Sequence, residues 1–375
     1  MYLHKISHLL LGSAMLFAQN SWAETIVAAS GTGAQHPYSE KQFPAIAKKM
    51  SDITDGSWTI RNTNNSLVKY MEMKNALRDD VVQIGKIPMS YFPSDYPASL
   101  LPADVATMQI DPYVVAAATT EYLTACLQCQ QEFAANKQVY LGNDALPPFH
   151  ILARKKVDSL DDLSGLRVRT AGPSSAAVIK HLGGNTVNLS IDETFTALNQ
   201  GIIDATHGGI YNLQSRRLID ITTHVYEISS GLLGTSIMAS TSLWQRLSLA
   251  DRHALVRSAQ FGIAAGIKAI IDEDSESKGA GIAAGIKFSK PDTATLAKIE
   301  EYKLEHKDKV IEKLKSKGVL NVDAEVQRFD ELLVKWSQLL KSPKTEEEYA
   351  NLLYNEIWAH VDFATYGISK NSEKN

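Results

Sequence analysis

The segment Ser164-Gly165-Leu166-Arg167-Val168-Arg169-Thr170-Ala171-Gly172 (SGLRVRTAG) places two arginines on either side of a valine, in what reads as a short strand. Because side chains alternate between the two faces of a strand, Arg167 and Arg169 share one face and the apolar residues the other. A helical turn that ends at Gly165 precedes the strand, and a loop that opens a helix capped by Ser174 follows it. The segment therefore predicts one helix–strand–helix unit of an α/β fold, with cations where a core is expected.

The position of Arg169 at the carboxyl end of this strand indicates a ligand. Open α/β sheets bind their ligands at the carboxyl ends of strands. The planar guanidinium suits bidentate contact with a carboxylate, and each charge-assisted hydrogen bond contributes roughly 1.5–3 kcal/mol. Arg167 lies further from the strand end, and we expect it to form a surface ion pair.

Short β-branched runs alternate with longer helical patterns along most of the chain. Alternation of this kind predicts helices layered on largely parallel sheets, and the number of strands favours two sheets over one. After residue 293 the chain is helical, with Lys and Glu interspersed as on solvated helix faces. The strand candidates are 25–29, 58–62, 81–84, 138–142, 150–153, 167–170, 185–189, 205–207 and 236–240; the helix candidates are 41–54, 68–78, 114–136, 174–182, 191–200, 210–217 and 250–276.

The N-terminus has the layout of a secretory signal. Lys5 precedes an apolar run from Leu9 to Phe17, and Ser21-Trp22-Ala23 offers a small-residue cleavage site before Glu24. The apolar run is too short to span a bilayer, and we expect no later segment to be long and apolar enough either. We therefore predict a cleaved signal peptide over residues 1–23 and an exported, soluble mature protein.

The charge balance argues against two classes of partner. The chain carries 38 Lys and Arg against 42 Asp and Glu, a net charge of −4 that becomes −5 when the signal peptide, with Lys5 its single fixed charge, is removed. A mildly acidic protein without a basic block is a poor binder of nucleic acid. It also lacks the polybasic clusters of a membrane-surface protein.

The two cysteines, Cys126 and Cys129, form a CxxC pattern within a helix-like run. In an exported chain we expect a local disulfide, which closes a small loop and stabilises little. A thioredoxin-like redox site is the alternative, but such a site stands at a strand-to-helix turn rather than inside a helical pattern. Two thiols without a nearby pair of histidines also make zinc improbable.

A second candidate region runs from Gln200 to Tyr211 (QGIIDATHGGIY) and reads as helix end, turn, strand, glycine-rich loop and helix. Gly208 and Gly209 allow the backbone to approach a small ligand at a helix N-terminus, where free N–H groups favour an anion. His207 is either a ligand contact or a hydrogen-bonded structural histidine, and the sequence leaves both open.

Three motifs in this order resemble one known family: DLSGLRVR at 162–169, ETFTALNQGIID at 193–204 and STSLWQRL at 240–247. Together they resemble the dicarboxylate-type substrate-binding proteins of tripartite ATP-independent periplasmic (TRAP) transporters, over roughly residues 24 to 292. The resemblance implies a two-lobed α/β periplasmic binding protein that closes on an organic acid and passes it to integral-membrane TRAP permease subunits. We expect crossing strands near 145–150 and 232–238, lobe I over 24–147 plus 236–280, lobe II over 148–235 plus 281–292, and C-terminal helices over 293–375 that brace both lobes.

The resemblance also implies a role for several residues. The arginine at the Arg169 position pairs with the ligand carboxylate, and His150 lies near the place where some members carry a second cation. The chain has His207-Gly208-Gly209 where many members have Glu-Asn-Pro, and Ile191 where sialic-acid binders have phenylalanine. Two N-terminal loops, 30–38 and 86–91, are expected to face the cleft. The candidate ligand-binding residues are Arg169, His150, His207, Gly208, Tyr211, Ser30, His36, Ser90 and Tyr91, with Tyr38 as a further cover for an apolar ligand body.

We therefore predict an extracytoplasmic receptor for a small organic acid, with no catalytic residue, no cofactor and no metal ligand. A periplasmic enzyme that uses the same cleft is the alternative. The sequence has no nucleophile elbow, no paired histidine ligands and no cofactor fingerprint, although isolated acids such as Asp192 and Glu193 keep the alternative open. The identity of the acid stays open as well.

Overall fold

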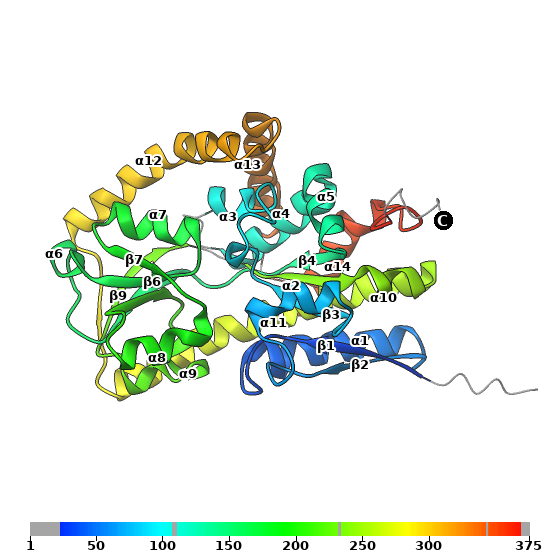
Figure 1. Cartoon of the computed structure of the whole chain (residues 1–375), viewed down its shortest axis with the longest axis horizontal. Helices are drawn as coiled ribbons and strands as arrows, with labels where there is room; N and C mark the ends of the chain where they lie inside the picture. Colours follow the sequence, from blue (N-terminus) through cyan, green and yellow to red (C-terminus); the bar gives the residue numbers. More distant parts are fainter. Residues whose placement is uncertain (1–22, 107–110, 232–233, 343, 369–375) are drawn as a thin grey trace, which may run out of the picture.

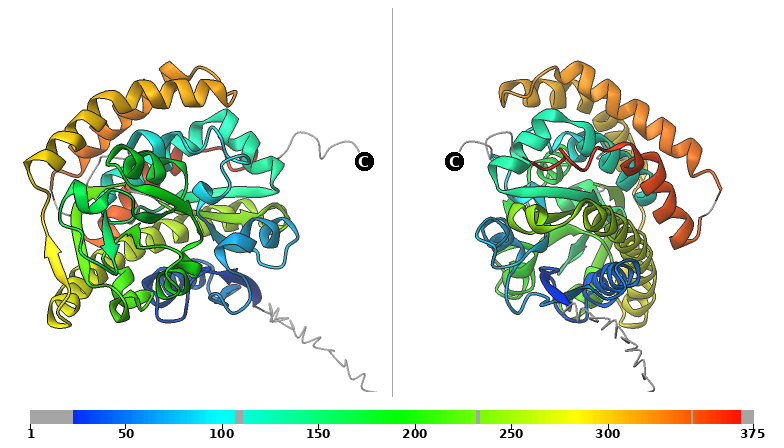
Figure 2. Two further views of the ribbon diagram at one scale, coloured as in Figure 1. Left: turned by 60° about the vertical axis from the view of Figure 1, so that its left-hand side comes forward. Right: turned by 90° about the vertical axis from the view of Figure 1, so that its right-hand side faces the viewer.

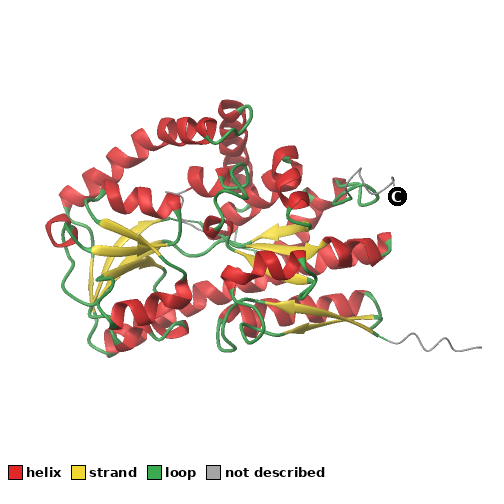
Figure 3. Ribbon diagram, viewed as in Figure 1, coloured by secondary structure: helices red, strands yellow, loops and turns green. Residues whose placement is uncertain are grey.

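The computed structural model describes residues 23–106, 111–231, 234–342 and 344–368. The predicted signal peptide lies outside the described residues except for Ala23, and β1 begins at Glu24. The strands form two separate sheets, each with helices packed around it (Figures 1 and 3). We call the part of the chain around the five-stranded sheet lobe I and the part around the six-stranded sheet lobe II.

Lobe I is built on a sheet with the strand order β2-β1-β3-β10-β4. β1 pairs in parallel with β2 and β3, whereas β10 pairs antiparallel with β3 and β4. Apolar side chains on α1, α2, α4 and α5 pack against this sheet and form the largest hydrophobic core. The elements are β1 (Glu24–Ala29), α1 (Phe43–Ile53), β2 (Trp58–Asn62), α2 (Tyr70–Arg78), β3 (Ile84–Ile87), α3 (Leu101–Val105), α4 (Pro112–Ala125), α5 (Leu127–Ala135), β4 (Gln138–Asn143), β10 (Ser236–Ser240) and α10 (Thr241–Arg246).

Lobe II is built on a sheet with the order β11-β9-β5-β8-β6-β7. β6 pairs in parallel with β7 and β8, and β9 with β11, whereas β5 is antiparallel to β8 and β9. Hydrophobic clusters flank this sheet. The elements are β5 (Phe149–Ala153), α6 (Leu160–Leu163), β6 (Arg167–Thr170), α7 (Pro173–His181), β7 (Asn185–Asn188), α8 (Thr194–Asn199), β8 (Ala205–Gly208), α9 (Asn212–Ser215), β9 (His224–Ser230) and β11 (Lys287–Ser289).

The expectation of largely parallel sheets is wrong in one respect, because each sheet contains an antiparallel strand away from its edges. These strands are β10 and β5, and each is the first strand that the chain forms after it crosses from the other lobe. Most other strands run toward the gap between the lobes, whereas a strand that follows a crossing starts at that gap. β9 was missed, and β3 lies three residues later than the predicted 81–84.

Two long helices also connect the lobes (Figures 1 and 2). α11 (Leu249–Ala283) packs against α1 in lobe I and against α9 in lobe II. α12 (Thr293–Ser316) returns on the opposite side, from α7 of lobe II to α3 of lobe I. α13 (Val322–Leu339) then packs on α4, and α14 (Glu346–Glu356) packs on α11. The lobes are therefore joined by two crossing segments and by two helices.

α11 corrects the expectation that no segment after the N-terminal run is long and apolar enough to cross a membrane. Within the described residues it is the one helix that meets this test, with a mean hydropathy of 1.4 over an 18-residue window. However, 72% of that window is buried inside the protein, because α11 packs against α1 and α14. Its apolar composition is that of a core helix.

The helix predicted over 114–136 is two helices that meet at Cys126. The backbone of Cys126 is extended (φ −79°, ψ 107°), so it ends α4 and caps α5, where its sulfur accepts a hydrogen bond from the N–H of Cys129. The two sulfurs form a disulfide, which confirms the expected local pairing.

Replacement of both Cys126 and Cys129 by serine is expected to lower the free energy of unfolding by no more than about 2 kcal/mol, since a disulfide that closes so short a loop restricts the unfolded chain little. Ligand affinity should stay unchanged, because neither cysteine lines the cavity described below. Urea unfolding and ligand titration of the double variant test this. Loss of function with an intact fold would favour the redox interpretation instead.

Candidate functional site

A cavity lies between the two lobes, where β3 and β10 of lobe I meet β6 and β8 of lobe II. It encloses about 550 Å³ of empty space, its opening to solvent included. About 60 Å³ of this space can hold the centre of a water-sized sphere, so the cavity is small in the closed structure. The lining residues are His36, Tyr38, Tyr70, Pro88, Ser90, Tyr91, Leu146, Phe149, Arg169, Ala171, Ile191, Gly208, Tyr211, Asn212, Arg216, Gly234 and Thr235.

Arg169 is a buried cation without an acidic partner. Only 2% of the residue is exposed, and within the described residues its guanidinium forms no ion pair. Its Nε donates to the carbonyl of Leu189 at 2.9 Å, and its Nη2 donates to the hydroxyl of Tyr91 at 2.8 Å. Arg167, two residues earlier on β6, differs in both respects, because it is half exposed and pairs with Asp204 at 3.0 Å. The expected ion pair of Arg167 is therefore present, and Arg169 is the one of the two β6 arginines that lines the cavity.

The cavity is closed by contacts between the lobes. The hydroxyl of Tyr91, in the 3-10 turn Met89–Tyr91 of lobe I, accepts from Arg169 and from the N–H of Ile191 at 3.0 Å, both in lobe II. A Cβ built on Gly172 (φ 115°) would lie 2.6 Å from the carbonyl oxygen of Ser90, so only glycine permits this approach of the two lobes. The structure is therefore a closed form of the two-lobed fold.

A second closing contact involves Ser174, which we expected to cap α7. The helix instead begins with Pro173 at its first position and has Gly172 as the residue before it. Ser174 therefore does not cap α7. Its hydroxyl instead donates to the carboxylate of Asp104 on α3 of lobe I. Lys313 of α12 contacts the same carboxylate at 2.8 Å.

Arg216 is a second cation of the cavity, and the sequence interpretation missed it. It follows α9 directly, and its Nη1 donates to Asp192 at 2.8 Å. Asn212 lies four residues earlier on the same helical turn, so the two side chains share a face. Among the described residues, Arg216 Nε and Asn212 Oδ1 are buried without a hydrogen-bond partner. The spacing of Asn212 and Arg216 after the glycine-rich loop was the available sequence signal.

Six of the seventeen lining residues of the cavity carry an aromatic ring. Tyr38 and His36 come from lobe I, with ring centroids 4.9 Å apart, and Tyr211 of lobe II meets His36 edge-on at 6.2 Å. Burial lowers the pKa of His36 well below its usual value, with Arg216 and Lys86 adding to the effect. His36 is therefore neutral at neutral pH. Tyr70, Tyr91 and Phe149 complete the aromatic lining.

Six of the nine predicted ligand-binding residues line this cavity: Arg169, His36, Ser90, Tyr91, Gly208 and Tyr211. Ser30, His150 and His207 do not. Ser30 is buried behind the first loop, where its hydroxyl bonds to Ser39 at 2.8 Å. His207 lies between the hydroxyls of Ser175 (2.7 Å) and Ser230 (3.1 Å), which is the structural alternative that the sequence left open.

His150 does not supply a second cation to the cavity. Its Nδ1 accepts from the N–H of Ser229 at 3.3 Å, and it is not among the lining residues. Burial lowers the pKa of His150 to about 4, so the ring is neutral at neutral pH. The second cation that lines the cavity is Arg216, which directly follows α9.

Acid is expected to destabilise the protein through these buried histidines. Burial lowers the pKa of His207 to about 3 and that of His150 to about 4, from a usual 6.5. Below pH 6.5 the unfolded chain binds protons that the folded chain does not bind, so the free energy of unfolding falls as the pH drops toward 4. Urea unfolding across this range checks the slope. A His150→Gln, His207→Gln double variant should show a weaker dependence, and an identical one would contradict this assignment.

The acids considered as catalytic candidates have structural partners. Asp192 pairs with Arg216, and Glu193 accepts from the N–H of Ser190 in a capping box at the start of the 3-10 turn Ile191–Glu193. Neither Asp192 nor Glu193 is a lining residue. The arrangement is therefore suited to binding an anion, because the side chain of Arg169 is fixed in the wall of a cavity that also contains aromatic rings.

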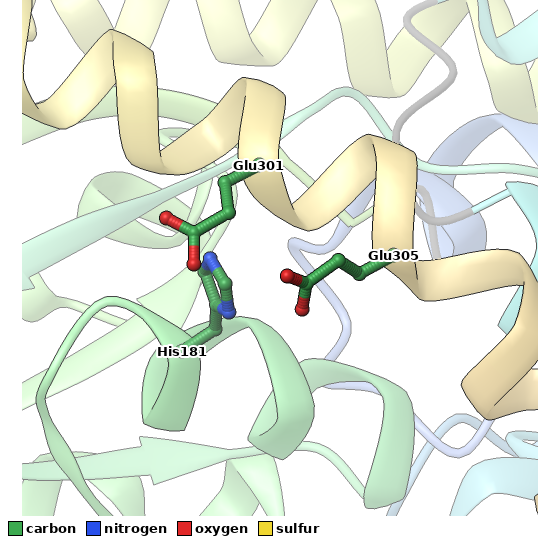
Figure 4. Close-up of side chains that lie close together, drawn as sticks. All are labelled: His181, Glu301 and Glu305. Carbon is green, nitrogen blue, oxygen red and sulfur yellow. The ribbon is translucent and has the colours of Figure 1, made fainter.

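One further cluster lies outside the cavity (Figure 4). His181 at the end of α7 faces Glu301 and Glu305 of α12, with possible ligand atoms within 4.8 Å of one another. Both carboxylates already form ion pairs, Glu301 with Lys298 at 2.7 Å and Glu305 with Lys309 at 2.6 Å. The His181 Nε2 lies 3.0 Å from the carbonyl of Lys298. All three side chains thus have partners within the protein, and the cluster links α7 of lobe II to α12.

Comparison with known proteins gives one family and many related structures. Residues 29–313 match the family model of bacterial extracellular solute-binding proteins, family 7. A solute-binding protein of Roseobacter denitrificans is 23% identical over 255 residues, which are 66% of this chain and 75% of that protein.

Two crystal structures are similar in fold. A TRAP periplasmic solute-binding protein of Bordetella bronchiseptica with bound mandelate has a TM-score of 0.73 and 20% identity, over 83% of this chain and 99% of that one. The sugar acid binding protein of Advenella mimigardefordensis with galactonate has a TM-score of 0.70 and 18% identity, over 83% and 99%. Both support the two-lobed fold.

Proposed function

Because this chain belongs to the bacterial extracellular solute-binding proteins of family 7, we propose that it is an extracytoplasmic receptor for a small organic acid, bound between the lobes with Arg169 at its carboxylate. Family membership makes the protein a solute-binding protein and not an enzyme. The resemblance to the dicarboxylate type concerns sequence motifs, and the number of carboxylates on the ligand is a separate question.

The observation that carries the proposal is the buried, unpaired charge of Arg169 in the wall of a cavity. A buried charge without a counter-charge is costly and persists where a partner is supplied. A ligand carboxylate is such a partner, since the guanidinium offers parallel N–H donors that match two carboxylate oxygens. In the present closed form, the Tyr91 hydroxyl and the Leu189 carbonyl accept two of these donors.

The proposal extends to the route of the ligand. A cleaved signal over 1–23 exports the protein to the periplasm, where lobe I (24–147 plus 236–280) and lobe II (148–235 plus 281–292) close on the acid. The two sheets and their crossing segments support this division, and the contacts of α12 with both α7 and α3 support a bracing role for 293–375. The closed receptor then delivers the acid to the membrane subunits of a TRAP permease, the partner that the sequence motifs imply.

The experiment is a thermal-unfolding screen of the secreted protein against monocarboxylates, dicarboxylates, keto acids, aromatic acids and sugar acids, with mass spectrometry of the recovered compound. We expect at least one acid to raise the melting temperature and to be recovered unchanged, since a ligand that binds only the folded state stabilises it. Absence of stabilisation by every acid, or chemical conversion of the bound acid, would contradict the proposal.

A further inference from the structure

We propose that the ligand is a monocarboxylate with an aromatic ring, and that Asp192 sets the preference for a single negative charge by holding Arg216 in an ion pair. This inference rests on the proposed function and names the chemical class of its ligand. It follows from two independent observations, the charges around the cavity and the side chains of its wall.

The charge around the cavity matches one carboxylate. Among the described lining residues, the two ionised side chains are Arg169 and Arg216. The charge of Arg216 is compensated by Asp192 at 2.8 Å, in a pair whose side chains are only 12% and 16% exposed. Arg169 alone has no acidic partner, so the pocket presents one net positive charge.

A second ligand carboxylate would meet an arginine whose Nη1 already donates to Asp192, although its Nε has no hydrogen-bond partner among the described residues. To reach Arg216 it would have to displace Asp192 or lie beside it, and like charges at close range repel strongly where water is excluded. Breaking the pair would leave a mostly buried carboxylate without its partner, which is costly. The Arg216–Asp192 pair therefore excludes dicarboxylates, although Arg216 itself lies in the cavity wall.

The neighbouring charged groups do not change this balance. Lys86 lies behind Tyr38, does not line the cavity and pairs with Asp144. His36 is in the wall, and its burial beside Arg216 and Lys86 keeps the ring neutral. Asp274 of α11 is not a lining residue. Its carboxylate accepts a hydrogen bond from the N–H of Tyr211 at 2.8 Å.

The wall favours an aromatic ring as the body of the ligand. Tyr38, Phe149 and Tyr211 belong to one buried cluster between the lobes, together with Leu146, Ala171 and Ile270. Tyr70 and Tyr91 face the same cavity. Aromatic side chains bind a ring by offset or edge-on contacts that exceed simple apolar burial by about 0.5–1.5 kcal/mol per pair. A sugar acid has no ring face for such contacts, so it could gain only from the polar groups of the wall, such as Ser90, Asn212 and Thr235.

The test is equilibrium titration of the full secreted protein with four kinds of probe: benzoate, cyclohexanecarboxylate, the three phthalate isomers and gluconate. The wild type should bind benzoate about fivefold or more tightly than cyclohexanecarboxylate and about tenfold or more tightly than any phthalate or gluconate. In Asp192→Asn, the affinity ratio of the best phthalate to benzoate should rise about tenfold, because Arg216 becomes available to a second carboxylate. Asp220→Asn is the matched control, since Asp220 pairs with Arg217 at the exposed end of the same segment. It should leave the ratio unchanged.

A second variant keeps the test decisive if Asp192→Asn does not fold. The double variant Asp192→Asn, Arg216→Gln removes both charges and leaves the net charge of the pocket as it was, so its ratio of phthalate to benzoate affinity should not rise above about threefold the wild-type ratio. A wild type that prefers a phthalate, gluconate or an aliphatic acid, an unchanged phthalate ratio in a folded Asp192→Asn, or a phthalate ratio raised about tenfold in the double variant would overturn the inference.

These failures are distinguishable from failure of the proposed function. Binding of an aliphatic acid or a diacid that still depends on Arg169 would leave the receptor function in place and remove only the ligand class. Failure of every acid in the wider screen to bind would remove both.

Discussion

Arg169→Ala is expected to weaken binding of the organic acid about 100-fold or more. The variant removes two charge-assisted hydrogen bonds to the carboxylate, each worth roughly 1.5–3 kcal/mol, from a site that excludes water. It also removes the single net positive charge of the pocket. Calorimetric titration of the wild type and the variant with the acid identified in the screen measures the effect.

Arg167→Ala is the matched control for this result. Arg167 lies on the same strand, but it is half exposed and its partner Asp204 is a residue of the protein. Its loss should change ligand affinity by less than about threefold, as is usual for an exposed ion pair away from the site. Equal losses of affinity in the two variants would mean that the charge of β6 as a whole, rather than the position of Arg169, attracts the acid.

Asp144→Ala is expected to have the largest effect on stability, a loss of about 3–5 kcal/mol in the free energy of unfolding. Asp144 follows β4 at the first crossing, and its carboxylate pairs with Lys86 of β3, with both side chains fully buried. It also accepts from Gln42 Nε2 at 3.0 Å and from the N–H and hydroxyl of Thr235 at the second crossing. One carboxylate thus ties β3 to both segments that join the lobes.

The variant would leave Lys86 with its charge buried and its main partner gone. Burial already lowers the pKa of Lys86 to about 8, and the carboxylate of Asp144 opposes that shift. Urea unfolding at neutral pH measures the loss. Asp95→Ala, which breaks the partly exposed pair of Asp95 with Lys74, should cost less than about 1 kcal/mol. Similar losses in the two variants would contradict a special role for the buried pair.

Much of the fold was predictable from local sequence patterns. The strand that carries Arg169 has its predicted bounds, because a helical turn with a terminating glycine and a following loop frame it. The direction of β5 and β10 was not predictable in this way. It depends on where the chain crosses from one lobe to the other, and local sequence patterns do not show these crossings. The bend at Cys126 was not predictable either, because a helix-like pattern with apolar residues continues on both sides of it.

The site was predictable where a side chain stands at a strand end. Arg169, Gly208 and Tyr91 lie at or just after the ends of β6, β8 and β3, and all line the cavity. His150 and His207 also lie on strands β5 and β8, but both are buried outside the cavity lining and bond to a backbone N–H or to hydroxyl groups. Arg216 was missed because its role depends on a partner, Asp192, that lies 24 residues away in sequence.

The proposed receptor recognises a carboxylate by its negative charge. Calorimetric titration of the wild type with the tightest-binding acid from the screen and with its primary amide, which has nearly the same shape but no charge, separates recognition of charge from recognition of shape. We expect the acid to bind and the amide to bind at least about 100-fold more weakly, because the amide cannot neutralise Arg169. Comparable affinities for the acid and the amide would contradict it and would assign recognition to the aromatic wall alone.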